Sequence, residues 1–338
     1  MPKQMRAVMI DEFGPSNVMR IRLADRPEPG SGQLLIRARY ASVNPADWKI
    51  RAGLLDRVGA DGFPMILGMD VAGVVEAVGT GVADFTPGDR VAALSGMGLQ
   101  LGLRGTYGEY CCTPAVRAVK LPDHLSFEEG ATIPIAAASA ASTIIDVAKV
   151  KPGDVVLFNG GAGSVGTFGV QFLKLLGAKV AATCSTGNLM RLRGYGIDKL
   201  IDYTREDVLD SLRAWVPEGV DCVIDAVGLG SLPANTPEMV KPGGIIACIQ
   251  TLIKDVDGYD AELAARRNVK IVDNISQTVH VGTPLFQVEG FRQVVAGVAS
   301  GKIKVPPYKV LPLEEVAQAH DEVEQGHFKG KILLKIGA

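Results

Sequence analysis

The fold is decided by the stretch Val155-Val156-Leu157-Phe158-Asn159-Gly160-Gly161-Ala162-Gly163-Ser164-Val165-Gly166. Its four leading apolar residues predict a buried parallel strand, and residues 167–177 predict an amphipathic helix that ends at Gly177. Between them the glycines follow the pattern G-x-G-x-x-G, which permits a tight turn, lets a pyrophosphate approach the backbone, and packs the helix closely on the strand. Because a second apolar strand is expected at 179–184, the pattern predicts a dinucleotide-binding turn rather than a merely structural one.

Length and composition indicate a soluble globular protein with two domains. The chain has 338 residues, of which 47% are hydrophobic and 21% are charged, and its formal net charge is −2. Acidic and basic residues are interspersed, so we expect neither a nucleic-acid partner nor a membrane-binding surface. The N-terminal residues show no signal-peptide core, and the Ala/Ser-rich residues 130–148, interrupted by Pro134 and Asp146, predict a buried helix rather than a membrane span.

The five cysteines favour a cytoplasmic protein with reduced thiols. Cys184, Cys222 and Cys248 fall within predicted strands, where cysteine packs as a small hydrophobic residue. Cys111 and Cys112 are adjacent, and neighbouring side chains on a strand point to opposite faces, so they form a poor chelating pair.

The pattern of predicted elements indicates an α/β protein built from two different domains. Residues 1–127 contain short strands separated by glycine and proline turns, which predicts a compact, partly open β-barrel. From residue 128 onward, strands alternate with helices, which predicts a doubly wound parallel sheet covered on both faces. The expected strands are 155–158, 180–184, 200–201, 222–225, 245–249 and 269–272, and the expected helices between them include 189–195, 205–215 and 231–240.

The C-terminal elements do not continue this alternation. A helix at 288–300, a strand at 308–311, a helix at 313–325 and a strand at 331–336 are expected there. We therefore predict that the chain returns to complete the first domain, giving domains of residues 1–127 with 273–338 and of residues 128–272.

Several motifs appear in an order that resembles one known family. Residues 41–53 are similar to an S-V-N-P-x-D segment, and residues 64–75 are similar to the signature P-x-x-x-G-x-D-x-A-G-x-V. Further matches lie at 85–91, 105–110, 225–228 and 329–334. Together they resemble the medium-chain dehydrogenase/reductase superfamily, in its zinc-independent quinone oxidoreductase (zeta-crystallin-like) branch.

This resemblance implies a GroES-like catalytic domain and a Rossmann domain, with the cofactor in the cleft between them. It implies hydride transfer from NAD(P)H to a quinone or to a C=C bond conjugated to a carbonyl. It also implies a homodimer joined through the edge of the Rossmann sheet.

The residues expected for a zinc site are missing. Zinc-dependent relatives carry a His-Glu pair where this chain has Met69-Asp70, and a cysteine near the position of Asn44. The four histidines show no ligand spacing, and we expect each of them on the surface or in a loop. We predict a protein without zinc, which makes simple alcohol oxidation unfavourable.

The residues after the second Rossmann strand favour NADPH over NADH. NADH sites usually hold the ribose 2′-hydroxyl with a carboxylate about 20 residues after the glycines, and Ser185, Thr186 and Asn188 stand there instead. Arg191, or Arg193, supplies positive charge for a 2′-phosphate, although both arginines also suit the solvated face of a helix. By resemblance, Tyr203 contacts this phosphate, whereas the family's lysine aligns with Asn188.

Four residues are candidates for the chemistry. By resemblance, Asn44 lies near the nicotinamide ribose, and Asp47 orients it; a turn before Pro45 and a helix cap are the alternative roles. Lys49 would stabilise an enolate oxygen or be a solvated lysine, and Tyr107 would be a phenol facing the cleft or a packing residue.

Trp48 and Met69 are expected to line an apolar substrate pocket, because an indole donates a hydrogen bond but is no proton source. The residues predicted to bind the cofactor are Asn44, Ser139, Gly161, Ala162, Gly163, Ser164, Val165, Gly166, Ser185, Thr186, Asn188, Arg191, Tyr203, Val227, Gly228, Ile249, Gln250 and Lys331.

The sequence thus predicts an NADPH-dependent, zinc-independent reductase of a small electrophilic acceptor, either a quinone or an α,β-unsaturated carbonyl. A trans-2-enoyl-thioester reductase is one alternative, for which no basic cluster that would bind the CoA phosphates stands out. A non-enzymatic NADPH-binding protein is the other.

Overall fold

The computed structural model describes residues 3–54, 62–94, 105–228, 236–249, 260–273, 288–326 and 330–337. The chain forms two units, one of Met1–Ile135 with Pro306–Ala338 and one of Ala136–Val305. We predicted boundaries near 127 and 273, and the observed units divide later at both places. The helix α9 (Val288–Ala299) stays with the second unit because it packs on α4 (Ser164–Leu175). Within the described residues, no helix combines the length and apolar character needed to cross a bilayer.

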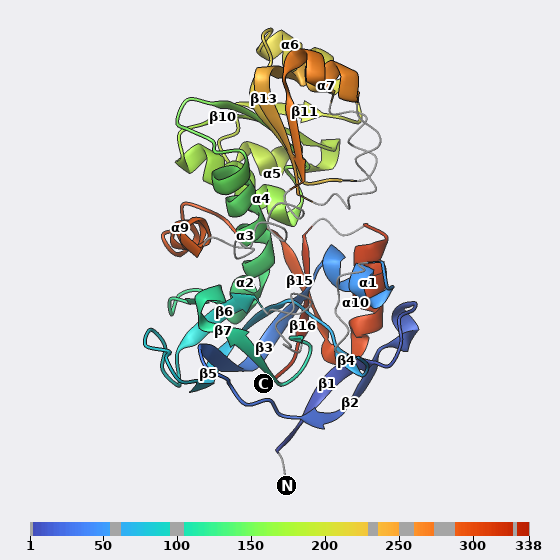
Figure 1. The fold of residues 1–338 in the computed structure, drawn as a ribbon, viewed down its shortest axis with the longest axis vertical. Coiled ribbons are helices and arrows are strands. Elements are labelled where there is room, and N and C mark those ends of the chain that lie inside the picture. Colours follow the sequence, from blue (N-terminus) through green and yellow to red (C-terminus); the bar gives the residue numbers. More distant parts are fainter. Residues whose placement is uncertain are drawn as a thin grey trace. The chain divides into compact units, whose positions relative to one another are not determined.

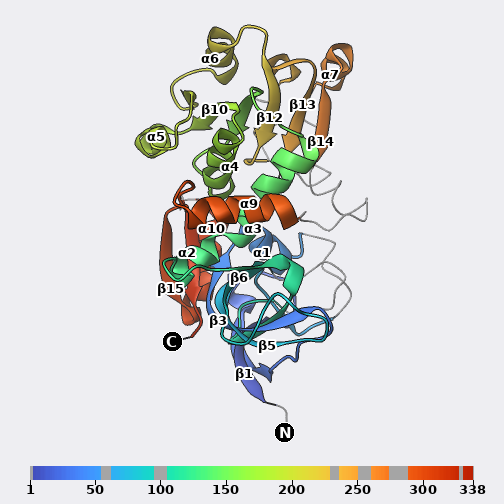
Figure 2. The same ribbon diagram turned by 90° about the vertical axis from the view of Figure 1, so that its left-hand side faces the viewer.

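The second unit is a doubly wound parallel sheet, as predicted (Figure 2). The chain runs outward from β9 to β11, returns to the other side of β9 at β12, and continues to β14. This reversal beside β9 is the switch point at which such sheets bind nucleotides, at the carboxyl ends of the strands. The strand order is β11 (Lys199–Asp202), β10 (Lys179–Cys184), β9 (Val155–Asn159), β12 (Val220–Asp225), β13 (Val240–Cys248) and β14 (Lys270–Asp273), and every neighbouring pair is parallel.

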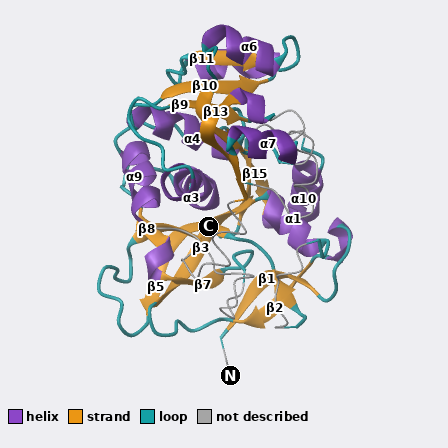
Figure 3. Ribbon diagram, turned by 45° about the horizontal axis from the view of Figure 1, so that its top comes forward, coloured by secondary structure: helices purple, strands orange, loops and turns teal. Residues whose placement is uncertain are grey.

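The helices predicted in this unit begin and end close to the observed positions, with one exception, and the helix at Ala261–Arg267 was not predicted. Figure 3 shows α4, α6 (Val208–Trp215) and α7 (Ala261–Arg267) around the sheet, and Figure 2 shows α5 (Leu189–Arg193) as well. The helix predicted at 231–240 is wrong over its described part, where Pro237–Met239 form a single 3₁₀ turn and β13 begins at Val240. Val240 pairs with Val220 and Ile245 with Cys222, so the register shifts between these pairs over residues 241–244 of β13. Residues 231–235 of that prediction lie outside the described part of the chain.

The first unit is built from two β-sheets, and both ends of the chain contribute to it (Figure 1). A three-stranded sheet has the order β2-β1-β4, and a seven-stranded sheet has the order β15-β16-β3-β5-β6-β8, with β7 paired to β3. The strands are β1 (Gln4–Ile10), β2 (Arg20–Asp25), β3 (Gln33–Val43), β4 (Met65–Ile66), β5 (Asp70–Val78), β6 (Arg90–Leu94), β7 (Tyr110–Pro114), β8 (Ala118–Lys120), β15 (Tyr308–Pro312) and β16 (Lys331–Lys335). The C-terminal segment therefore returns to this unit as predicted, and it inserts β16 between β15 and β3.

Helices complete the first unit at the ends of these strands. Helix α1 (Pro45–Arg51) follows β3 directly, and α10 (Val316–Glu324) packs against it. Helix α2 (Phe127–Thr132) lies on β3 and β5. The single helix predicted at 130–148 is divided, since α2 ends before Pro134, α3 (Pro134–Ser142) begins there, and a π-helical turn (Thr143–Val147) follows.

Candidate functional site

The glycine turn joins β9 to α4 at the switch point of the second unit. Gly160 has a φ of 81°, so the left-handed position lies one residue before Gly161, where we expected the tight turn. A side chain on Gly166 would lie 2.2 Å from the Gly160 carbonyl oxygen, whereas one on Gly163 would meet nothing closer than 3.5 Å. Gly166 thus packs the helix against the turn. Gly163 leaves the backbone open to a ligand beside the first turn of α4, whose N–H groups have no acceptor within the helix.

Several of the predicted cofactor residues come together beside this turn. Arg191 donates from Nη2 to the Ala162 carbonyl oxygen at 2.6 Å and to Asn188 Oδ1 at 3.1 Å. Asn188 in turn donates to Ser185 Oγ at 3.0 Å. The structure therefore links the glycine turn to the end of β10 through Arg191, whose Nη1 has no partner among the described residues.

A carboxylate that was not among the predicted site residues lies at the end of β11. Asp202 accepts the Thr186 hydroxyl at 2.5 Å on Oδ2 and the Thr204 hydroxyl at 2.6 Å on Oδ1. These two bonds, the Thr186 one first, lower the pKa of Asp202. Tyr203, the next residue, is 56% exposed.

Two further strand ends face the same edge of the sheet. Asp225, at the end of β12, accepts the N–H of Val227 at 2.8 Å and that of Gly228 at 3.3 Å, which forms the turn after the strand. Val227 lies against Gly160, and Ile249 donates its N–H to the Asp225 carbonyl oxygen at 2.8 Å. Gln250 lies outside the described residues.

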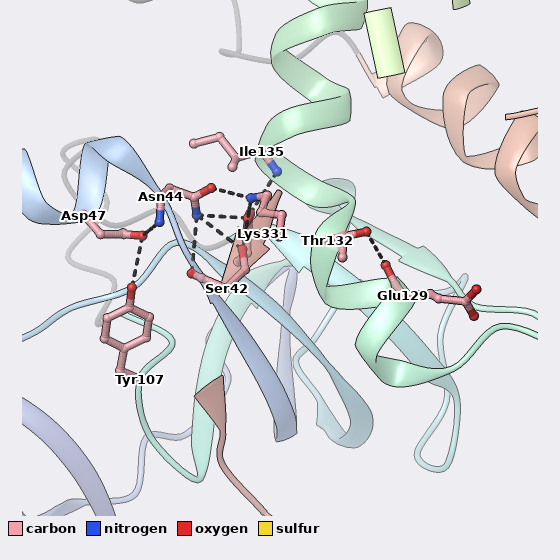
Figure 4. A network of polar contacts seen from close by, with 9 residues as sticks. Ser42, Asn44, Asp47, Tyr107, Glu129, Thr132, Ile135 and Lys331 are labelled. Carbon is pink, nitrogen blue, oxygen red and sulfur yellow. Dashed lines mark hydrogen bonds and ion pairs between the residues drawn. The ribbon is translucent and has the colours of Figure 1, made fainter. Parts of the chain in front are cut away.

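Strand register gathers a buried polar cluster in the first unit. Strands β16, β3 and β5 are neighbours, with Leu333 opposite Ser42 and Ser42 opposite Asp70. Lys331 at the start of β16 and Asn44 just after β3 therefore lie together at one end of the sheet (Figure 4). Asp70, at the start of β5, contacts both of them.

An ion pair between Lys331 and Asp70 forms the centre of this cluster. The Lys331 ammonium lies 3.0 Å from Asp70 Oδ2, and the two residues are 3% and 0% exposed. Asp70 Oδ2 also accepts the Ser42 hydroxyl at 2.6 Å and Asn44 Nδ2 at 3.0 Å, while its Oδ1 accepts the Ile135 N–H at 2.8 Å. Lys331 donates its other bonds to Ser42 Oγ and Asn44 Oδ1. The carboxylate and the ammonium are thus both fully hydrogen-bonded, as buried charges require.

Asp47 and Tyr107 extend the cluster into α1. Asp47 Oδ2 accepts the backbone N–H of Asn44 at 2.8 Å, which closes a capping box at the start of the helix, and the Tyr107 hydroxyl at 3.1 Å. Burial raises the pKa of Asp47 to about 7, and the Asp70 carboxylate adds to this effect. Burial, together with Asp47, also raises the pKa of Tyr107 far above its ordinary value. Asp47 therefore caps the helix and orients Asn44 at the same time.

Four other predicted residues, Trp48, Lys49, Met69 and Ser139, have their described contacts outside this cluster. Lys49 lies 5.9 Å from the Trp48 ring centroid, and Met69 packs against the core of the first unit. Ser139, on α3, accepts the Thr143 hydroxyl at its carbonyl oxygen.

His320 corrects one expectation. It is completely buried on α10, where we expected a surface or loop histidine, because α10 packs its His320 face against α1 and the Tyr107 ring. Burial lowers the pKa of His320 to about 3, and the charge of Arg51 adds to this effect. His320 is therefore neutral at ordinary pH.

The donor set does not fit a catalytic zinc ion. Among the described residues, no group of three or more His, Cys, Asp and Glu side chains is arranged to hold a metal. Asp70 is surrounded by a serine, an amide and the Lys331 ammonium, which is no metal ligand and repels a cation.

Four residues of the cluster were predicted as site residues, namely Asn44, Asp47, Tyr107 and Lys331. Ser42 and Asp70 were not predicted. The signal was present, because Asp70 and Lys331 are each a charged residue directly before an apolar strand. Charged residues are rarely buried unless they are paired.

Comparison with known proteins agrees with this architecture. The family model for the alcohol dehydrogenase GroES-like domain matches residues 30–123, and that for zinc-binding dehydrogenases matches residues 195–334. Human quinone oxidoreductase is 30% identical, with 98% of each chain covered. The human synaptic vesicle membrane protein VAT-1 homolog is 31% identical over 98% of this chain and 87% of its own length.

Solved structures of related proteins have the same fold over nearly the whole chain. The quinone oxidoreductase from Coxiella burnetii has a TM-score of 0.83 at 29% identity and covers 99% of this chain and 100% of its own. A mycobacterial protein solved in complex with NADPH has a TM-score of 0.80 at 28% identity over 98% of this chain and 99% of its own.

The two units define an oxidoreductase of the GroES-like and Rossmann type that uses a nicotinamide cofactor. The chain belongs to the medium-chain dehydrogenase/reductase superfamily, in its quinone oxidoreductase branch. The expected fold and family are thereby confirmed.

Loss of the central ammonium should be costly for the folded state. Lys331→Met leaves the Asp70 carboxylate buried and unpaired, so we expect the free energy of unfolding to fall by about 3–5 kcal/mol in urea denaturation. Asp70→Asn added to Lys331→Met should restore part of the loss. The matched control is Lys309→Met, which removes a half-exposed pair with Glu322 and should cost about 0–1 kcal/mol. An equal effect of the two single variants would contradict a buried, energetically important pair.

Proposed function

We propose that this protein is an NADPH-dependent, zinc-independent reductase that transfers a hydride to a quinone or to an α,β-unsaturated carbonyl compound. The observation that carries the proposal is the orientation of the Asn44 amide. Because Asn44 Oδ1 accepts from Lys331, its Nδ2 must act as a donor, with one bond to Asp70 at 3.0 Å. The other contacts of Nδ2, to Ser42 O and Oγ, are both 3.4 Å long, which leaves donor capacity for an oxygen of the acceptor.

The cofactor would be held by the second unit, and when bound it supplies the hydride. Gly163 and the first turn of α4 would accept the pyrophosphate, and Val227, Gly228 and Ile249 would line the nucleotide along the strand ends. Catalysis by this chain would then consist mainly of holding the two reactants together and excluding water.

The same cluster supports zinc independence. A metal Lewis acid polarises an unactivated carbonyl or alcohol. By the resemblance, Met69-Asp70 stands where zinc-dependent relatives carry a His-Glu pair, and here Asp70 is paired with the Lys331 ammonium. An acceptor that is already electrophilic, such as a quinone or an enone, suits this arrangement.

A preference for NADPH is supported by the charges beside the glycine turn. Arg191 is held against Ala162 and retains an Nη1 without a described partner, and a guanidinium is well matched to a phosphate. The Asp202 carboxylate is already bonded to two threonine hydroxyls. The mycobacterial relative solved with NADPH agrees with this choice.

Arg191→Ala should separate the two cofactors. We expect the KM for NADPH to rise roughly 10- to 100-fold, because a charge-assisted hydrogen bond contributes about 1.5–3 kcal/mol, and the KM for NADH to change much less. Arg193→Ala is the control, since Arg193 is exposed on the same helix. Equal loss with both cofactors would mean that Arg191 only supports the turn.

The proposed activity is tested by following NADPH absorbance with purified, EDTA-treated protein. The acceptors would be benzoquinone, phenanthrenequinone, a small set of enones and an enoyl thioester, each also tried with NADH. We expect rapid oxidation of NADPH by quinones or enones, and the ratio between them identifies the preferred class. Activity that vanishes with EDTA and returns with zinc would contradict the metal-free assignment. Binding of NADPH without oxidation by any acceptor would favour a non-enzymatic role.

The resemblance also leads us to propose a cytoplasmic homodimer. In the described part of the sheet, β11 and β14 are the edge strands, and a second copy would pair through one of them. Light scattering of the purified protein should give twice the mass of the 35.6 kDa chain, and a monomeric mass would contradict the proposal.

A further inference from the structure

Helices α1 and α10 face each other with two matched pairs of polar residues. Asp47 and Arg51 are four residues apart on α1, so they share one face, and His320 and Glu324 share a face of α10 in the same way. Arg51 Nη2 pairs with Glu324 Oε2 at 2.7 Å. Tyr107 links the other pair, since its hydroxyl bonds to Asp47 and its ring lies edge-on to His320 at a centroid distance of 5.8 Å.

The facing residues carry buried polar atoms without a partner among the described residues. These atoms are Asp47 Oδ1, Arg51 Nη1, and both ring nitrogens of His320. Asp47, Arg51 and His320 are each no more than 1% exposed. Buried polar groups in folded proteins are almost always hydrogen-bonded, either to protein or to internal water. The set contains a cationic donor, a carboxyl oxygen and an imidazole, which together offer the two to four polar partners that a buried water needs.

We propose that internal water occupies the space between Asp47, Arg51, Tyr107 and His320, and that Asp47 stores there, as a carboxylic acid, the proton that the reduced acceptor takes up. The inference rests on the proposed reductase function, because hydride transfer leaves one negative charge on an oxygen of the acceptor. The O–H bond of Asp47 breaks, its proton passes through water to that oxygen, and Asp47 becomes a carboxylate. A proton from solvent then returns through the water beside His320 and restores the acid. Asp47 thus acts through water, as a residue that supplies and positions a proton.

The charges around Asp47 favour storage of a proton there. Burial opposes ionisation most strongly, and the charge of Asp70 adds to it. The Asn44 N–H, the Tyr107 hydroxyl and the charge of Lys331 favour the ionised form. Arg51 is balanced by Glu324, and His320 is neutral. Burial outweighs the bonds that favour ionisation, so the pKa of Asp47 is about 7, above its ordinary 3.8. Asp47 is therefore almost fully protonated below about pH 6 and loses its proton as the pH rises through 7.

The main test compares Asp47→Asn with the wild-type protein. Asparagine keeps an oxygen for Asn44 N–H and Tyr107 but holds no transferable proton. In single-turnover measurements with an enone, we expect product protonation in the wild type to slow about tenfold per pH unit above 7, as for a single acid. Asp47→Asn should be slower by about 100-fold or more and insensitive to pH in this range. The matched control is Asp207→Asn, which changes an exposed helix cap of α6 and should retain the wild-type profile.

A second variant tests the path by which the proton returns. His320→Phe keeps a ring against Tyr107 and removes both nitrogens. We expect the first turnover to remain at the wild-type rate and steady-state turnover to fall about tenfold, within the range for one proton-transfer group. Unchanged steady-state turnover would overturn the role of His320.

Two measurements are independent of catalysis. Infrared difference spectra should show a carboxylic acid carbonyl band that titrates near pH 7 and is missing from Asp47→Asn. A crystal structure should show ordered water bonded to Asp47 Oδ1 and His320. A fully ionised Asp47 at pH 6, or a dry site, would overturn the inference, even if the reductase activity is found. Absence of activity with a titrating Asp47 and water in place would instead contradict the proposed function.

Discussion

The site in the first unit depends on one buried ion pair, Lys331 with Asp70. Taking two charges out of water costs several kcal/mol per ion, and the attraction between them offsets that cost only when every remaining donor and acceptor is satisfied. Here Ser42, Asn44 and the Ile135 N–H complete the set. The requirement for full satisfaction leaves Asn44 a single orientation, so the ion pair determines which way the amide faces.

The same requirement explains why the two ends of the chain meet in one unit. Asp70 comes from β5, Asn44 from the end of β3, and Lys331 from β16, which is separated from β3 by almost the entire sequence. Pairing of β16 with β3 buries Ile332 and Leu334 in the core and brings the ammonium to the carboxylate. Apolar burial stabilises the sheet, and the pairing of Leu333 with Ser42 gives the register that aligns the charges.

Most of the fold could be predicted from sequence because its signals are local. The apolar strand at 155–158, the glycine spacing and the helix after it each depend on neighbouring residues, and the structure reproduces them. The helix predicted at 231–240 failed over its described part because β13 begins at Val240, and its pairing with Val220 of β12 joins residues that are distant in the sequence. The prediction that His320 lies on the surface or in a loop was wrong for a similar reason. The burial of this histidine depends on α1 and Tyr107, which no sequence window around His320 contains.

The individual site residues were predictable, but their connections were not. Asn44, Asp47 and Lys331 stand in motifs, whereas the pairing of Lys331 with Asp70 arises from register across three strands. That pairing also has a consequence for Asp47. A buried site that already holds one carboxylate and one ammonium has no net charge, and a second carboxylate would leave an uncompensated anion in a medium of low dielectric constant. Keeping Asp47 protonated near neutral pH removes that cost. A neutral buried acid next to a balanced ion pair is thus the arrangement in which the network is both stable and able to release a proton when a negative charge develops nearby.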